Sequence, residues 1–188
     1  MDIVNALRTR LHRGLRGFAK DASGSIAVEA VVMLPIMLWV FLASFVYFDA
    51  FRQSAVNLKA ANTIGDMLSR ETAAVNDDYV SSMHSLMVFL TKKDADPALR
   101  ISVAMWDEED DMYRLDWSEG RGNRPGMTES ELNAMRDRLP ILPDNERIIL
   151  VETWSTYKPA FNVGLKQDEL YNRIFTSPRF APQVAWAD

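Results

Sequence analysis

The 188-residue sequence contains no cysteine, and it has only two histidines, His12 and His84. The absence of cysteine excludes disulfide bonds, thiolate metal sites and cysteine nucleophiles together. His84 has no evident catalytic partners around it, so we predict a surface or half-buried structural role, while His12 lies in a basic N-terminal segment. The net charge of −5 lacks the positive excess typical of nucleic-acid binding, and no nucleic-acid partner is predicted.

Three short motifs resemble ligand-binding or catalytic patterns but lack the spacing that the chemistry requires. The acidic run 107–111 (DEEDD) has no alternating oxygen ligands and no turn glycine, so we predict a solvated hairpin tip instead of a calcium loop. Residues 155–158 (STYK) match S-x-x-K, but they end a predicted strand, in which residues three apart face opposite sides. Residues 119–126 (EGRGNRPG) lack the glycine spacing of a phosphate loop and predict a flexible loop. No catalytic residue, cofactor or metal is therefore predicted, and we expect the protein not to be an enzyme.

The charge is distributed unevenly along the chain. Five basic residues and two acidic residues precede Gly24, which leaves a net charge of −8 on the remainder. A basic arm therefore stands ahead of an acidic body, an asymmetry that is typical of a segment flanking a membrane.

An apolar run occupies residues 26–48 and is interrupted only by Glu29 and Ser44. As a helix, 23 residues extend about 34 Å, enough to cross a bilayer core of about 30 Å. The basic residues ahead of the run place the N-terminus in the cytoplasm by the positive-inside rule. The run is longer than the apolar region of a signal peptide, which has about 7–15 residues, so we expect it to be retained.

The segment SGSIAVEA places Gly24 at the boundary between the polar leader and the apolar run, with Glu29 as the fifth residue after it. This pattern resembles the cleavage site of type IV-like prepilins. The longer segment GSIAVEAVVMLPIM is similar to the head of the TadE-like minor pseudopilins of tight-adherence (Tad/Flp) pilus systems. Two C-terminal segments, VETWSTYKPAF and SPRFAPQ, also resemble patterns of this family.

The sequence departs from the short major Flp pilins, which carry a tyrosine directly after the glutamate and lack a large domain. Here Ala30 follows Glu29, and about 140 residues follow the apolar run. A relative with an added von Willebrand-type domain would be longer than this chain. The residues quoted fit the TadE subtype and the TadF subtype equally, so both remain alternatives.

The resemblance implies that a membrane-embedded prepilin peptidase cleaves between Gly24 and Ser25 on the cytoplasmic side. Cleavage would create an α-ammonium group on Ser25, with which Glu29 of a neighbouring subunit can pair. Either charge left unpaired in an apolar environment is costly, so the pair would set the register of subunit docking. The alternative is an interfacial glutamate, because Glu29 lies only about 5 Å of helix rise inside the run and can reach headgroup water.

Beyond the apolar run, the helix is predicted to continue to about Arg70. An apolar stripe at spacings of three and four residues indicates this continuation; it consists of Phe51, Ala55, Leu58, Ala61, Ile64 and Leu68. A single helix from Ser25 would be about 69 Å long. The alternative is two helices with a break near Asp49, and Gly65 weakens the helix in either version.

The remaining sequence predicts an α+β domain with an antiparallel sheet. Helices are predicted at 76–90, with Asn76 or Asp77 as the cap, and at 128–139, where Thr128 and Glu131 form a capping box. Strands are predicted at 100–106, 112–117, 147–157 and 171–176, the third of them central.

The domains predicted are a basic cytoplasmic leader (1–24), a transmembrane helix (25–48), a helical neck (49–95) and an extracytoplasmic α+β domain (96–188). The resemblance implies a minor pilin or pilus-assembly protein, single-pass in the bacterial inner membrane with a periplasmic C-terminal domain. Its partners would be the prepilin peptidase, other pilins, Tad inner-membrane assembly proteins and the lipid bilayer. The alternative is a membrane-anchored extracytoplasmic enzyme or ligand-binding domain. Whether the protein enters the fibre or stays at its base stays open.

Overall fold

A computed structural model describes residues 25–91 and 95–187 of the chain. It divides into two compact units, Met1–Phe45 and Val46–Asp188, which are described separately and are called the N-terminal and C-terminal units. Gly24 and the leader lie outside the described residues.

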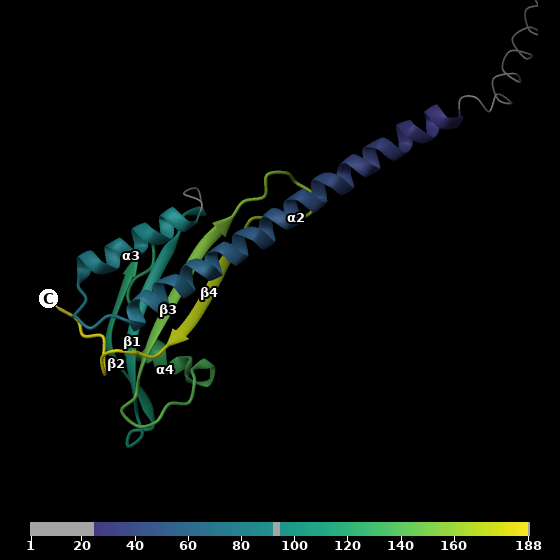
Figure 1. The fold of residues 1–188 in the computed structure, drawn as a ribbon. Coiled ribbons are helices and arrows are strands. Elements are labelled where there is room, and N and C mark those ends of the chain that lie inside the picture. The colour runs from purple at the N-terminus through teal and green to yellow at the C-terminus, as the bar shows by residue number, and fades with distance from the viewer. Residues whose placement is uncertain (1–24, 92–94, 188) are drawn as a thin grey trace, which may run out of the picture. The chain divides into compact units, whose positions relative to one another are not determined.

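Helix α2 (Ser25–Ser69) runs for 45 residues without interruption and passes through Pro35 (Figure 1). The predicted single helix is therefore confirmed, and the alternative with a break near Asp49 is wrong. Polar side chains along α2 bond back to carbonyl oxygens four residues earlier, as Ser44 does to Val40 at 2.8 Å and Thr63 to Lys59 at 2.9 Å. Such local bonds satisfy the hydroxyl groups without a partner element.

The C-terminal unit contains a four-stranded antiparallel sheet in the order β2-β1-β3-β4. Its strands are β1 (Ala98–Asp107), β2 (Met112–Arg121), β3 (Arg147–Tyr157) and β4 (Asp168–Thr176). The α+β class, the antiparallel sheet and the central position of β3 are thereby confirmed. All four strands were expected, and β3 has the predicted bounds.

Strand β2 is longer than predicted, so the loop expected at 119–126 is wrong for its first three residues. A register shift between Val103 and Ala104 leaves Asp116 unpaired, and β2 then resumes pairing as far as Arg121. The segment that follows folds back tightly on the strand. A Cβ atom on Gly120 would lie 2.1 Å from the Arg124 carbonyl oxygen, a separation that only glycine allows.

Helix α3 (Asp77–Leu90) is capped by Asn76, whose side chain accepts a 3.0 Å hydrogen bond from the backbone amide of Tyr79. Helix α4 (Glu129–Ala134) begins with the predicted capping box of Thr128 and Glu131. It is shorter than expected, because the chain tightens into a 3-10 turn, η3 (Arg136–Arg138), before reaching Leu139. Both helix starts were predicted because capping depends on residues only three apart.

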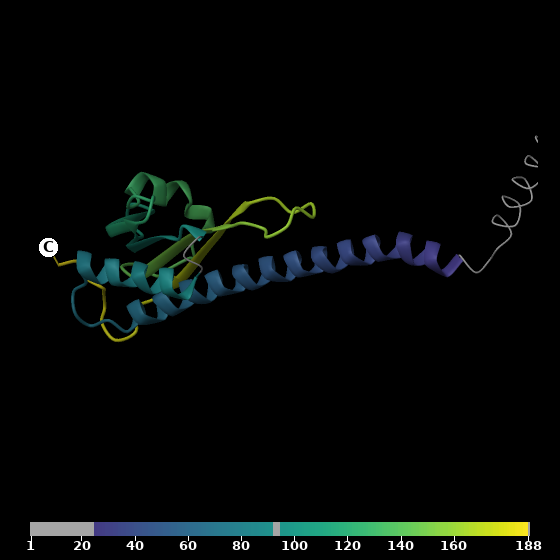
Figure 2. The same cartoon turned by 90° about the horizontal axis from the view of Figure 1, so that it is seen from above.

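The two faces of the sheet carry separate cores. The second half of α2 and helix α3 cover one face, and α4 lies on the other (Figure 2). The larger core lies under α2 and α3 and is completed by the C-terminal segment, where Val184 is 1% exposed and its carbonyl oxygen accepts a 2.7 Å bond from Trp117 Nε1. Its buried residues include Ile64, Leu68, Val80, Met87, Leu99, Ile101, Ile149 and Val151.

The buried face of α2 in the C-terminal unit differs from the predicted stripe. Ala61, Ile64 and Leu68 are buried as expected, but Phe51 is 73% exposed and Leu58 is 45% exposed. The position turned inward instead is Asn57, whose Nδ2 donates a 3.1 Å bond to the Leu170 carbonyl oxygen of β4. A polar residue therefore lies on the core side, and part of the apolar stripe is left facing outward.

Candidate membrane-spanning and docking helix

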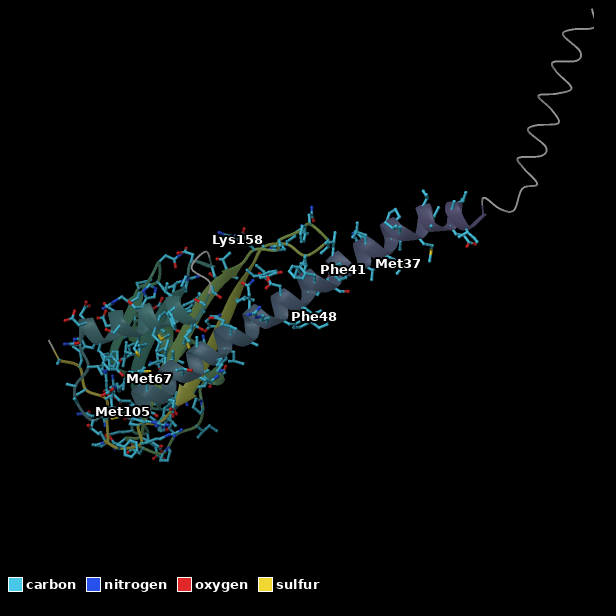
Figure 3. All side chains as sticks on the ribbon, turned by 45° about the horizontal axis from the view of Figure 1, so that its top comes forward. Met37, Phe41, Phe48, Met67, Met105 and Lys158 are labelled. Carbon is cyan, nitrogen blue, oxygen red and sulfur yellow. The ribbon has the colours of Figure 1, made fainter. Side chains whose placement is uncertain are left out.

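Within the N-terminal unit, residues 26–41 of α2 are apolar apart from Glu29 and are exposed on all sides of the helix. Every large apolar side chain from Ile26 to Phe41 is more than half exposed, and Figure 3 shows Met37 and Phe41 projecting from the helix. Among the helices that the structure describes, α2 alone is long and apolar enough to cross a membrane, with a mean hydropathy of 2.4 over its most apolar window.

Such a helix is unfavourable in water. Soluble monomers rarely expose a contiguous apolar patch larger than about 300–600 Å². Burying a large aliphatic or aromatic side chain contributes about 1.5–3 kcal/mol, and residues 26–41 include twelve such side chains exposed in the structure. The segment therefore requires lipid or other helices around it.

The residues of the predicted processing and docking site lie at the start of this helix. Gly24 lies outside the described residues, and Ser25 is the first residue of α2. Glu29 follows four residues later with an exposed side chain, so positions 25 and 29 share one face of the helix, one turn apart. A carboxylate in this position is accessible to a partner from outside the chain.

The outward apolar stripe continues into the C-terminal unit. Phe48 is 75% exposed, Phe51 73% and Leu58 45% (Phe48 is labelled in Figure 3). With Ala55, which is also exposed, these residues repeat at three and four residues and so share one face of α2. We call these four residues the outer stripe.

Comparison of the chain with protein-family models, with curated proteins and with solved structures gives no match.

Sequence reasoning missed a buried carboxylate on the sheet face opposite α2 and α3. Glu152 of β3 is 1% exposed. Arg100 of β1 donates to its Oε2 from Nε at 2.7 Å, and Arg173 of β4 donates to its Oε1 from Nε and Nη2 at 3.1 Å each. The Tyr171 hydroxyl also donates to Oε1. The signal in the sequence was a glutamate inside the apolar run of the strand RIILVETW.

Aromatic rings and a third arginine surround this carboxylate. The Trp154 ring lies 5.3 Å from the Arg100 guanidinium carbon and 4.8 Å from that of Arg124. Arg124 also pairs with Glu169 at 2.5 Å. Burial, and secondly the hydrogen bond to Glu152, raises the pKa of Tyr171 to about 12. Because each of the three guanidinium groups faces a carboxylate, the arrangement binds β1, β3 and β4 together.

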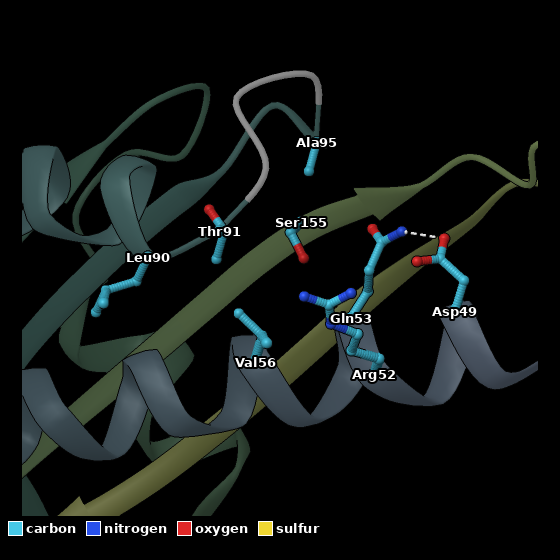
Figure 4. Close-up of a pocket in the computed structure, with 8 residues that line it drawn as sticks. All are labelled: Asp49, Arg52, Gln53, Val56, Leu90, Thr91, Ala95 and Ser155. Atoms are coloured by element: carbon cyan, nitrogen blue, oxygen red, sulfur yellow. Dashed lines mark hydrogen bonds between the residues drawn. The ribbon is translucent and has the colours of Figure 1, made fainter.

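A cleft of about 140 Å³ lies between α2, β3 and the end of α3, with Arg52 and Gln53 reaching from α2 and Ser155 lying on β3 (Figure 4). Gln53 Nε2 donates a 2.8 Å bond to Asp49 Oδ2 across its edge. Ser155 of the STYK motif is buried in the cleft wall, whereas Lys158 is exposed beyond the end of β3. The cleft is smaller than the about 300–1,000 Å³ typical of small-molecule sites.

The acidic run 107–111 forms the turn between β1 and β2, and its three aspartates pair with arginines. Asp107 lies 3.3 Å from Arg114, and Asp111 accepts 2.7–2.8 Å bonds from Arg136 through its carbonyl and Oδ2. The backbone amide of Asp110 is the largest influence that lowers the pKa of Asp107. Within 25–91 and 95–187, no group of three or more His, Asp or Glu side chains is placed to hold a metal.

His84 is half-buried on α3, with Nε2 2.9 Å from the Pro97 carbonyl oxygen. The imidazole must donate this bond, because a carbonyl oxygen only accepts. His84 thus ties α3 to the segment that precedes β1. His12 lies outside the described residues.

Proposed function

We propose that the chain is a minor pilin or pilus-assembly protein of a tight-adherence pilus. It is made as an inner-membrane precursor with the N-terminus in the cytoplasm and the C-terminal unit in the periplasm, and it is cleaved after Gly24. The sequence motif at 24–29 supports cleavage, and the outer stripe of α2 supports packing against other subunits.

The outer stripe carries this proposal because it extends beyond the length of helix that a bilayer can cover. An apolar core of about 30 Å is crossed by about 20 helical residues. Phe51 and Leu58 lie about 5 Å and 15 Å of helix rise beyond Phe48, the last residue of the apolar run. A helix that only anchors a domain gains nothing from exposed apolar residues at the positions of Phe51 and Leu58. A helix that packs against neighbouring helices buries them in the contact.

The chemistry of the helix start supports the same function. Once the leader is removed, the new α-ammonium group of Ser25 and the carboxylate of Glu29 are opposite charges in an apolar segment. Pairing between neighbouring subunits removes the cost of leaving either charge unpaired. The pair therefore favours one register of neighbouring helices over others.

Replacing the outer stripe with polar residues tests the packing function. The double variant Phe51→Ser/Leu58→Ser is expected to fold and to insert in the membrane, because both side chains are exposed in the structure. Its cross-linking to itself or to other pilins in cells should be largely lost, since each lost apolar contact costs about 1.5–3 kcal/mol.

The matched control is Phe89→Ser, which removes an equally exposed phenylalanine (83%) from α3, away from the outer stripe. This variant should cross-link as the wild type does. Equal cross-linking by the double variant and the wild type would contradict the assignment of the outer stripe to assembly.

A further inference from the structure

An apolar pocket of about 230 Å³ lies beside the β1–β2 turn, where the chain returns from η3 to β3. It is lined by Trp106, Tyr113, Arg136, Leu139, Ile141 and Leu142. An apolar cavity of about 150 Å³ can hold a benzene molecule, whereas small-molecule sites usually measure about 300–1,000 Å³. The size of this pocket therefore suits one large apolar side chain better than a whole substrate or cofactor.

Hydrogen bonds at both ends of the loop 139–146 hold the pocket in shape. The Tyr113 hydroxyl donates to the Pro140 carbonyl oxygen near the start of the loop. At its end, the Trp106 amide donates to the Glu146 carbonyl oxygen at 3.1 Å, and the Asn145 amide donates to the Trp106 carbonyl oxygen at 2.9 Å. The pocket is thus formed without a partner, which lowers the ordering cost of binding.

Ile141 stands on the rim of the pocket and is 100% exposed. Its neighbours differ, because Leu139 is 9% exposed and Leu142 packs against the smaller core. A single exposed isoleucine is ordinary on a protein surface. Here it adjoins an apolar pocket, so the two form one apolar patch on a fixed loop. An apolar patch with a polar rim is typical of a protein–protein contact.

The segments that line the pocket are acidic. Residues 106–114 and 136–146 together carry eight acidic and three basic residues. Such an excess of negative charge attracts a basic partner and repels an acidic one. A second copy of this chain, with its net charge of −8 beyond Gly24, is therefore disfavoured as the occupant.

The acidic β1–β2 turn adjoins the rim of the pocket directly (Figure 1). Asp111 accepts a 2.8 Å bond from Arg136 of the lining, and the Glu108 amide donates a 3.0 Å bond to Asp144 of the loop. The side chains of Glu108 and Glu109 are exposed, and neither forms an ion pair within residues 25–91 and 95–187. Two carboxylates beside the pocket are thus available to cations of a partner.

We propose that this pocket docks a large apolar side chain of a partner protein, carried on a segment whose flanking residues are lysine or arginine. The apolar side chain fills the space between Trp106 and Leu142 and packs against Ile141. The flanking cations face Glu108 and Glu109. The whole surface belongs to the C-terminal unit, so the inference is independent of the membrane span and of the cleavage site.

A short peptide tests both requirements. The full chain is placed in nanodiscs of phosphatidylcholine, which carry no net charge, and is mixed with the peptide Lys-Lys-Gly-Phe-Gly-Lys-Lys. The phenylalanine carries a fluorine atom that is observed by NMR. We expect the full chain to shift and broaden the fluorine signal, and empty nanodiscs to leave it unchanged. Unlabelled competitors with serine in place of phenylalanine, or glutamate in place of lysine, should displace the probe about tenfold less well or worse.

Four variants of the full chain locate the binding. Ile141→Ser should weaken it about tenfold, whereas Phe89→Ser, which removes an exposed phenylalanine from α3, should not. Glu109→Lys should weaken it several-fold, because one attractive charge becomes repulsive. Asp78→Lys makes the same change of charge at an exposed position on α3 and should leave the binding unchanged.

Each alternative occupant gives a different result. Equal displacement by the serine competitor would overturn the apolar pocket as the site of contact. Equal displacement by the glutamate competitor would overturn the basic character of the partner. Because the chain has no native cysteine, Ile141→Cys also tests a second copy as the occupant. Disulfide-linked dimers that form faster with Ile141→Cys than with Phe89→Cys in detergent would overturn the inference in favour of self-association.

Discussion

Replacing Gly24 with phenylalanine is expected to leave all of the protein as uncleaved precursor in cells that contain a prepilin peptidase. The glycine marks the boundary between the polar leader and the apolar run, and a bulky side chain next to the scissile bond prevents the close approach of the backbone that cleavage requires. The intact mass of the membrane-extracted protein distinguishes the precursor from a product shorter by 24 residues.

The leader offers a matched control, because Gly17 is also followed by an uncharged residue and lies in the same basic segment. The Gly17→Phe variant should be processed as the wild type is. Processing of Gly24→Phe to the wild-type mass would show that the cleavage site is placed wrongly.

Replacing Glu152 with alanine is expected to lower the free energy of unfolding by about 3–5 kcal/mol, the usual cost of removing one partner from a buried ion pair. The side chains of Arg100 and Arg173 are only 14% and 17% exposed, so both would keep a positive charge without its carboxylate. Tyr171 would lose the acceptor of its hydroxyl as well. Denaturant unfolding of the full chain in detergent, followed by tryptophan fluorescence, measures the change, because Trp154 lies within this cluster.

Glu169→Ala is the control for this prediction. Glu169 also pairs with an arginine beside Trp154, but its side chain is 51% exposed and that of Arg124 is 35% exposed. Exposed pairs contribute about 0–1 kcal/mol, so this variant should unfold almost as the wild type does. An equal loss in the free energy of unfolding for the two variants would contradict the claim that the buried Glu152 pairs stabilise the fold more than the exposed Glu169 pair.

The sequence predicted those parts of the fold that depend on neighbouring residues. The caps at Asn76 and Thr128 involve partners three residues away, and the run RIILVETWSTY, which is rich in β-branched residues, gave the bounds of β3. Where the orientation of a side chain depends on tertiary contacts, the sequence did not predict it. Asn57 takes the inward position on α2 because the Leu170 carbonyl oxygen accepts its amide, and no local pattern shows that bond.

The candidate sites follow the same division. Gly24, Ser25 and Glu29 lie within six residues of one another, so their motif is visible in the sequence before any fold is considered. The Glu152 cluster combines residues of β1, β3 and β4, and its register depends on strand pairing. The Tyr157 hydroxyl at the end of β3 donates to the Val46 carbonyl oxygen of α2, a bond between residues 111 positions apart that no local pattern in the sequence indicates.

The N-terminal sequence of the membrane-extracted protein tests the central claim most directly. In cells with a prepilin peptidase, the mature protein is expected to begin at Ser25, with the first residue of α2 carrying the free amino group. In cells without the peptidase it should begin at Met1. An intact Met1 in peptidase-proficient cells would contradict the assignment of the chain as a cleaved pilin-like precursor.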